Sequence, residues 1–131
     1  MSRTAFLLIA LLVSSCSPRE IEPVPIYEED TCSFCRMSIS EPRFAAEILS
    51  TSSEVYKFDD LGCLRSFRER RTDVVPAGVF VIDYDNGTWL PYHRAVVTVT
   101  GIRTPMASGL IATSSRARAA EIAEHHPPED Q

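Results

Sequence analysis

The sequence lacks the features that mark several common classes of protein. Basic residues cluster only between Arg65 and Arg71 and the net charge is −5, so we expect no nucleic-acid binding. The chain offers no Ser-His-Asp set, catalytic carboxylate pair or phosphate-binding loop, so we predict that it is not an enzyme. Its apolar runs are all shorter than the roughly 20 residues of a membrane-spanning helix. These absences leave a small, non-catalytic domain.

The N-terminus has the pattern of an exported bacterial lipoprotein. Arg3 precedes an apolar run from Ala5 to Val13, as in a signal peptide. The run leads into Ser14-Ser15-Cys16, a lipobox, so we predict that residues 1–15 are removed and that Cys16 carries the lipid. Several acyl chains anchor a protein stably, so we expect it on the periplasmic face of the outer membrane. The alternative is an ordinary signal peptide in which Cys16 is incidental.

The rest of the chain divides into a tether, a domain and a tail. Residues 16–26 contain Pro18, Pro23 and Pro25 without a hydrophobic period, which is typical of an extended tether. Residues 27–124 suffice for one compact domain, or for two small halves that share a core. Residues 125–131 are polar and predict a flexible tail. Loss of Arg3 with the signal would change the net charge from −5 to −6, a weak bias towards cationic ligands.

Hydrophobic periodicity predicts an α+β fold for the domain. Bulky residues alternate at 44–49 and at 55–58 across a turn-like segment, so we predict a hairpin. Asp59 is a good N-cap for a helix from Asp60 to about Arg70. Further strands are expected at 79–84, 89–90, 95–100 and 110–112. A second helix should start after Thr113 or Ser114 and run to about His125, with an inner face of Ala119, Ile122 and Ala123.

The sequence Cys32-Ser33-Phe34-Cys35-Arg36-Met37 is the motif most indicative of chemistry. Of the four cysteines, Cys16 is assigned to the lipid, and an odd number cannot all pair within the chain. A C-x-x-C turn brings two sulfurs to one side of a loop, and Met37 can point the same way as Cys35 in an extended chain. Two thiolates and a thioether are soft ligands, which select Cu(I). The motif therefore favours a copper site.

Three other interpretations of this motif remain open. A structural zinc site would need four ligands, and no second C-x-x-C or suitably spaced His pair follows. A thioredoxin-like redox pair is a stronger alternative, because exported C-x-x-C motifs often belong to oxidoreductases. However, this motif precedes the first predicted strand, whereas a redox motif of that kind follows a strand and opens a helix. A disulfide that merely closes the loop is the third alternative.

Three residues outside this motif are further candidates. Cys63 falls beside the apolar stripe of the first predicted helix, where an inert core cysteine is the default, although it could face the loop as a third thiolate. Met106 follows Pro105 in a rigid loop and is either core filling or a second thioether ligand. His93 lies alone near a strand, and such a histidine is more often a surface residue than a ligand.

The ordered set of motifs resembles the NosL family, the accessory lipoproteins of nitrous oxide reductase. The resemblance covers residues 27 to about 123 and rests on the lipobox, Cys32-x-x-Cys35-x-Met37, Pro42-Arg43-Phe44-Ala45-Ala46, Tyr56-x-Phe58-Asp59-Asp60-Leu61-Gly62-Cys63 and Thr104-Pro105-Met106. Two positions depart from the family pattern. Arg36 stands where the family usually has glycine between the second cysteine and the methionine, and Ala107 stands where glycine often follows the Pro-Met pair.

The resemblance implies a membrane-anchored, periplasm-facing Cu(I) metallochaperone with two small ββαβ-like halves. It places the copper ligands at Cys32, Cys35, Met37 and Met106. It also implies a copper acceptor, nitrous oxide reductase in the known cases, and an upstream copper donor as a further partner. From a different class, an exported thiol-disulfide reductase that uses Cys32 and Cys35 to keep an acceptor's metal site reduced is the alternative.

Overall fold

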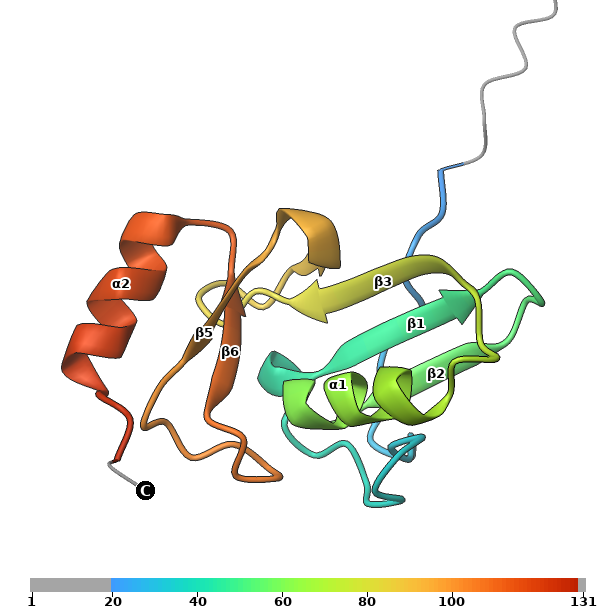
Figure 1. Cartoon of the computed structure of the whole chain (residues 1–131), viewed down its shortest axis with the longest axis horizontal. Coiled ribbons are helices and arrows are strands. Elements are labelled where there is room, and N and C mark those ends of the chain that lie inside the picture. Colours follow the sequence, from blue (N-terminus) through green and yellow to red (C-terminus); the bar gives the residue numbers. More distant parts are fainter. Residues whose placement is uncertain (1–19, 130–131) are drawn as a thin grey trace, which may run out of the picture.

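Two small antiparallel sheets and two helices make up the domain, which the computed structural model describes over residues 20–129 (Figure 1). One sheet has the strand order β2-β1-β3-β4, built from β1 (Ala46–Ser50), β2 (Val55–Phe58), β3 (Pro76–Ile82) and β4 (Trp89–Pro91). The other pairs β5 (Val96–Val99) with β6 (Leu110–Thr113). The helices are α1 (Leu61–Arg70) and α2 (Arg116–His125). The predicted α+β class is confirmed, whereas the signal and Cys16 lie outside the described residues.

Both halves of the domain contain two strands followed by a helix, but only the first half has a strand after its helix. The first half is β1, β2, α1 and β3, the expected ββαβ order. In the second half, β5 and β6 are followed by α2, and no further strand follows within residues 20–129. The short strand β4 joins the first sheet beside β3, with Val81 opposite Leu90. The second half is therefore a ββα unit packed against a completed first sheet.

Helix α1 begins one residue later than the sequence predicted. Asp60, and not Asp59, is the N-cap: its side chain accepts a hydrogen bond from the Gly62 amide at 2.6 Å. Either aspartate suits a cap, and sequence alone cannot choose between neighbours. The shift leaves the Asp59 side chain free of the helix and available for another role.

Apolar residues at alternate positions in the strands meet the inner face of α1. Ala46, Ile48 and Phe58 pack against Leu64 and Phe67 in one buried cluster. The Phe58 and Phe67 rings are 5.1 Å apart between centroids, within the range of favourable aromatic pairs. This core holds the N-terminal turn of α1 firmly against the end of β2.

The segment before the C-x-x-C loop is docked on the domain. The Val24 amide donates to Glu47 Oε1 at 2.8 Å, and Lys57 Nζ donates to the Pro25 carbonyl at 2.8 Å. Ile26 packs against the main core. Residues 24–26, assigned to the tether from their prolines, thus lie on the sheet, and the contacts that fix them are long-range. In Figure 1 this blue segment runs behind β1 and β3 towards the loop at residues 30–40.

The C-terminal segment contacts the domain further along the chain than its polar composition predicts. His125 is the last residue of α2, and the His126 carbonyl accepts a hydrogen bond from the Gly101 amide at 2.7 Å. Ala119 and Ile122 are buried as expected, but the N-cap of α2 is Ser115, one residue beyond the two predicted candidates. Across residues 20–129, every helix is too short or too polar to cross a bilayer.

Candidate metal centre

The C-x-x-C loop is held in one conformation by backbone hydrogen bonds. The Cys32 amide donates to the Met37 carbonyl at 2.8 Å, and the Arg36 amide donates to the Cys32 carbonyl at 3.1 Å. Ser33 fixes the loop to β2, because its amide donates to the Lys57 carbonyl at 2.7 Å and its Oγ accepts from the Lys57 amide at 3.1 Å. The loop therefore ends beside the residues that follow β2, and Asp59 is among them.

Three thiols and one carboxylate converge at this point. The sulfur atoms of Cys32, Cys35 and Cys63 and a carboxylate oxygen of Asp59 all lie within 4.8 Å of one another. The three thiols are free and form no disulfide. Cys32, Asp59 and Cys63 are buried, and Cys35 is half-buried, so the cluster opens to solvent on the Cys35 side.

Cys63 is buried in the core, as the default interpretation expects, and it also belongs to the thiol cluster. It is buried, with 2 % of its surface exposed, but it also lies in the first turn of α1 next to the C-x-x-C loop. Burial and access to the loop are compatible because the loop itself covers the start of the helix. The alternative interpretation, a third thiol at the site, is the one that the geometry supports.

Burial raises the pKa of two thiols in the cluster. It raises the pKa of Cys35 to about 11, with the neighbouring Cys32 adding to the effect. It raises the pKa of Cys63 further, together with the charges of Cys32 and Asp59. The free thiols of Cys35 and Cys63 are therefore protonated at neutral pH, and a metal ion must displace their protons to bind there.

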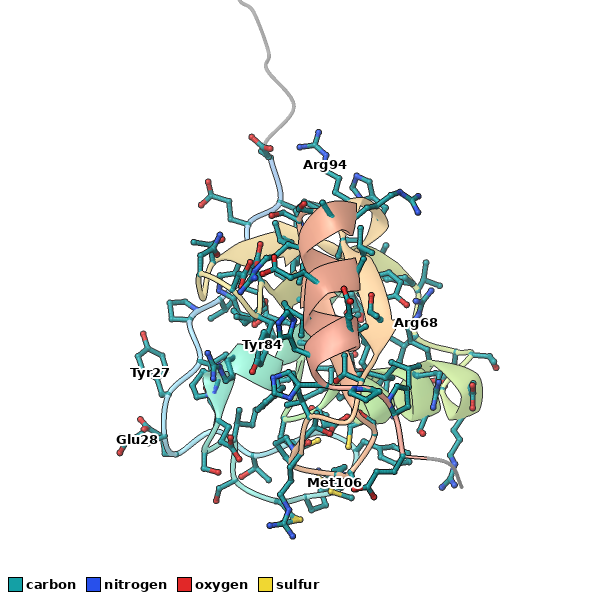
Figure 2. The ribbon with its side chains drawn as sticks, turned by 90° about the vertical axis from the view of Figure 1, so that its left-hand side faces the viewer. Tyr27, Glu28, Arg68, Tyr84, Arg94 and Met106 are labelled. Carbon is teal, nitrogen blue, oxygen red and sulfur yellow. The ribbon has the colours of Figure 1, made fainter. Side chains whose placement is uncertain are left out.

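The two methionines lie on the exposed side of the same end of the molecule. Met37 is 55 % exposed and Met106 is 42 % exposed. The Met106 amide donates to Asp60 Oδ2 at 2.9 Å, which fastens its loop to the start of α1, next to Asp59. Figure 2 shows sulfur atoms gathered at the lower end of the molecule, where Met106 is labelled. The exposure of Met106 argues against core filling.

The two departures from the family pattern occupy left-handed backbone positions. Arg36 has φ +69° and Ala107 has φ +55°. This conformation favours glycine and costs other residues about 1–2 kcal/mol. Each position lies next to a candidate methionine, so the turns that direct Met37 and Met106 keep their shape although the glycines are replaced.

Asp59 was missed by sequence reasoning, and His93 stays outside the cluster. The sequence indicates only a helix cap at Asp59, whereas the structure places Asp59 before the N-cap of α1 and in the cluster beside the C-x-x-C loop. His93 lies in a short 3-10 turn (Tyr92–Arg94) and is exposed. Within residues 20–129 it does not belong to the thiol cluster.

The cluster has a poor geometry for a thiol-disulfide reductase. Reactive cysteines of that class have lowered pKa values in electropositive surroundings, often at the start of a helix. Here the pKa of Cys35 is raised, and its sulfur lies 3.4 Å from a carboxylate oxygen of Asp59. The C-x-x-C motif also lies in a loop before β1 and does not open a helix. What the arrangement offers chemically is a set of sulfur ligands.

Comparison with solved structures identifies a protein with a similar fold. Searches of the sequence against protein-family models and against curated proteins find no match. The crystal structure of the copper chaperone NosL from Shewanella denitrificans is similar to this chain, with a TM-score of 0.73 at 18% sequence identity. The match covers 86% of this chain and 92% of that one. The chain therefore has the NosL fold, with three thiols and a carboxylate gathered at one end of it.

Proposed function

We propose that the chain is a Cu(I) metallochaperone that receives copper and passes it to a copper enzyme, nitrous oxide reductase being the expected acceptor. The convergence of Cys32, Cys35 and Cys63 is the observation that carries this proposal. Thiolates are soft ligands that prefer Cu(I), and the fold is that of a protein described as a copper chaperone. Nothing in the cluster provides the activated nucleophile that a reductase needs.

The proposed mechanism is stepwise ligand exchange. Copper would be held by thiolates of Cys32 and Cys35, with Met37 and Met106 on the exposed side as neutral thioether ligands. Neutral ligands are released at lower electrostatic cost than thiolates, so an acceptor can replace them first. The half-buried Cys35 would be exchanged next, and the buried Cys32 last. The order of exposure is thus the order of release.

The proposed location is the periplasmic face of a membrane, through a lipid on Cys16. The first described segment, drawn in blue, lies in the upper part of Figure 1, and the loops around residues 31–38 and 101–109 lie in the lower part. Intact mass of membrane-extracted protein should show a lipid increment on a chain that begins at Cys16, and an unmodified soluble form would refute the anchor.

A copper-transfer experiment tests the function. The reduced protein, loaded anaerobically with Cu(I), is mixed with copper-free nitrous oxide reductase, and the two are separated and assayed for copper. We expect copper to move to the enzyme from the wild-type protein and not from the Cys32→Ser/Cys35→Ser variant, while a Ser66→Ala control on α1 behaves as wild type. Copper that stays on the wild-type chain, or that reaches the enzyme equally well from free Cu(I), would exclude delivery to this acceptor.

A further inference from the structure

The second sheet has an open edge along β5. Within residues 20–129, β5 pairs with β6 alone. The Thr100 amide donates to the carbonyl that precedes β6, at 2.8 Å, whereas the Gly101 amide donates away from the sheet to the His126 carbonyl, at 2.7 Å. Successive amides of a strand point to opposite edges, so this alternation also directs the amides of Val97 and Val99 to the outer edge.

The outer edge of β5 is neither paired nor protected in the described part of the chain. Among the hydrogen bonds of residues 20–129, none joins the amides of Val97 or Val99 to a group beyond the sheet. Pro127 follows His126, and proline has no amide with which to extend the pairing along β5. The strand itself contains no proline, lysine or bulge of the kind that protects exposed edges. Such an edge is a template for a further strand.

A groove of about 360 Å³ lies beside this edge, on the face of the second sheet that is turned towards α1. Leu64 of α1 lines it together with Val97 and Leu110. Cross-strand partners share a face, so Val99, which lies opposite Leu110, is on the same face. Val97 is 37 % exposed and Val99 is 53 % exposed. The other face of the sheet packs against α2, so the apolar surface left open is the one beside the groove.

The rim of this groove is basic in a protein with a net charge of −5. Arg65 and Arg68 of α1 are exposed and line the groove, and neither belongs to an ion pair within residues 20–129. The Arg68 guanidinium lies 5.5 Å from the centre of the Tyr92 ring, and Figure 2 shows Arg68 between α1 and the second sheet. Glu69 is the one acidic residue that lines the groove. The positive rim favours an acidic occupant.

We propose that the outer edge of β5 and this groove bind an extended acidic segment of a partner protein, which adds a third strand to the second sheet. Main-chain hydrogen bonds to Val97 and Val99 would provide affinity. Every second side chain of the segment would lie on the groove face, where apolar groups contact the valines and carboxylates bind Arg65 and Arg68. β5 leads into the loop that carries Met106, so the bound partner would lie next to that loop. This interaction goes beyond the copper function and needs no metal.

Binding of a synthetic strand to the metal-free protein tests the proposal. The probe is a short fluorescein-labelled peptide, Val-Thr-Glu-Thr repeated twice, and its binding is followed by fluorescence anisotropy. We expect saturable binding that weakens as salt is added. A matched peptide with lysine in place of glutamate should bind at least about tenfold more weakly. N-methylation of one alternate set of peptide amides should abolish binding and N-methylation of the other set should not, because only one set faces β5.

Amide hydrogen exchange locates the contact on the protein. In the free protein, the amides of Val97 and Val99 should exchange faster than the amide of Thr98, which points to β6. Saturating peptide should slow exchange at Val97 and Val99 and leave Thr98 unchanged. If the peptide binds without slowing exchange at either valine, the site is not the edge of β5 and the proposal is wrong.

Charge reversal tests the basic rim. Arg65→Glu/Arg68→Glu should weaken peptide binding by at least about tenfold and change Tm little, because both side chains are exposed. Arg116→Glu is the matched control, since Arg116 is an exposed arginine on α2, which covers the other face of the sheet. Full peptide affinity in the double variant, or equal binding of the lysine peptide, would contradict an acidic partner.

The remaining outcome is that a second copy of the chain occupies the edge. Analytical ultracentrifugation without peptide should show a monomer over the concentrations used for binding. A dimer that protects the amides of Val97 and Val99 would identify the second copy as the occupant and overturn the proposal. All of these measurements use metal-free protein, so their failure leaves the copper function intact, and failure of the Cu(I) titration leaves the peptide site intact.

Discussion

Three buried aspartates illustrate how the partners of a side chain decide its role. Asp83 accepts the Asp85 and Ser114 amides and holds the turn after β3. Asp60 accepts the Gly62 and Met106 amides and joins α1 to a distant loop. Asp59 accepts only from a thiol in the described residues and lies in the thiol cluster of the candidate metal centre. Residue type and burial are alike in all three, so only the hydrogen bonds distinguish structure from site.

Met106 provides the sharpest prediction for a single residue. Met106→Ala should weaken Cu(I) binding by at least about tenfold, or 1.4 kcal/mol, because the proposed mechanism assigns its thioether to the copper site. Thermal stability should change little, since the side chain is 42 % exposed. Val99→Ala, at a 53 % exposed apolar residue on β5, is the matched control and should keep both properties. A stability loss of about 2–5 kcal/mol with normal affinity would make Met106 a core residue.

The protein should be more stable with glycine than with alanine at position 107. Its φ of +55° is strained for alanine, so Ala107→Gly is expected to stabilise the protein by about 0.5–1 kcal/mol in denaturant unfolding. Ala95→Gly is the control, because Ala95 has φ −80° and gains nothing from glycine there. Equal destabilisation by both substitutions would show that residue 107 is not strained.

The buried carboxyl of Glu47 should make the free energy of unfolding depend on pH. Burial raises the pKa of this carboxyl above its ordinary value of 4.5, so the folded state holds the proton more tightly than the unfolded state. The resulting stability is present below pH 4.5 and is lost as pH rises through the folded-state pKa. Glu47→Gln should therefore raise Tm at pH 8 and have a smaller effect at pH 4, whereas Glu69→Gln on the surface should do neither. A lower Tm for Glu47→Gln at pH 8 would contradict this sign.

At the level of elements, local patterns predicted the helices and most strands well. The apolar spacing of Leu61, Leu64 and Phe67 was enough to place α1, because it reflects burial against a sheet. The pairing of β4 with the first sheet was not predictable, since three residues carry too little pattern. The pairing of Cys32 with Cys35 in one cluster was predictable because the two are close in sequence. Asp59 and Cys63 join them only through the fold, so their role could not be read from spacing.

The contact between α1 and the Met106 loop can be tested through Asp60. Asp60→Ala removes the N-cap and the acceptor for the Met106 amide, and should destabilise the protein by about 0.5–2 kcal/mol. Cu(I) affinity should fall as well, because Met106 loses its fixed position. Ser115→Ala removes the N-cap of α2 and should lower stability without changing affinity. If both variants keep full Cu(I) affinity, the cap does not position the copper ligand.

The whole molecule places its candidate metal site on rigid supports at one end of the fold. The C-x-x-C loop is fixed to β2, the third thiol comes from α1, and the Met106 loop is fastened to the N-cap of that helix. The match to the NosL structure extends over most of both chains, so the fold that carries these supports is shared. The two candidate methionines are exposed and the thiols of Cys32 and Cys63 are buried, which is compatible with the ligand exchange proposed above.

Competitive titration of the reduced protein with Cu(I) and a chromogenic Cu(I) chelator tests the central claim most directly. The account predicts one tightly bound Cu(I) per chain, with an affinity that increases between pH 6 and pH 9 because protonated thiols, with the pKa of Cys35 at about 11, must lose their protons to bind. Cys32→Ser/Cys35→Ser should lose this binding and Ser66→Ala should keep it. A chelator that retains all of the copper, or an affinity that survives the loss of both cysteines, would contradict the account.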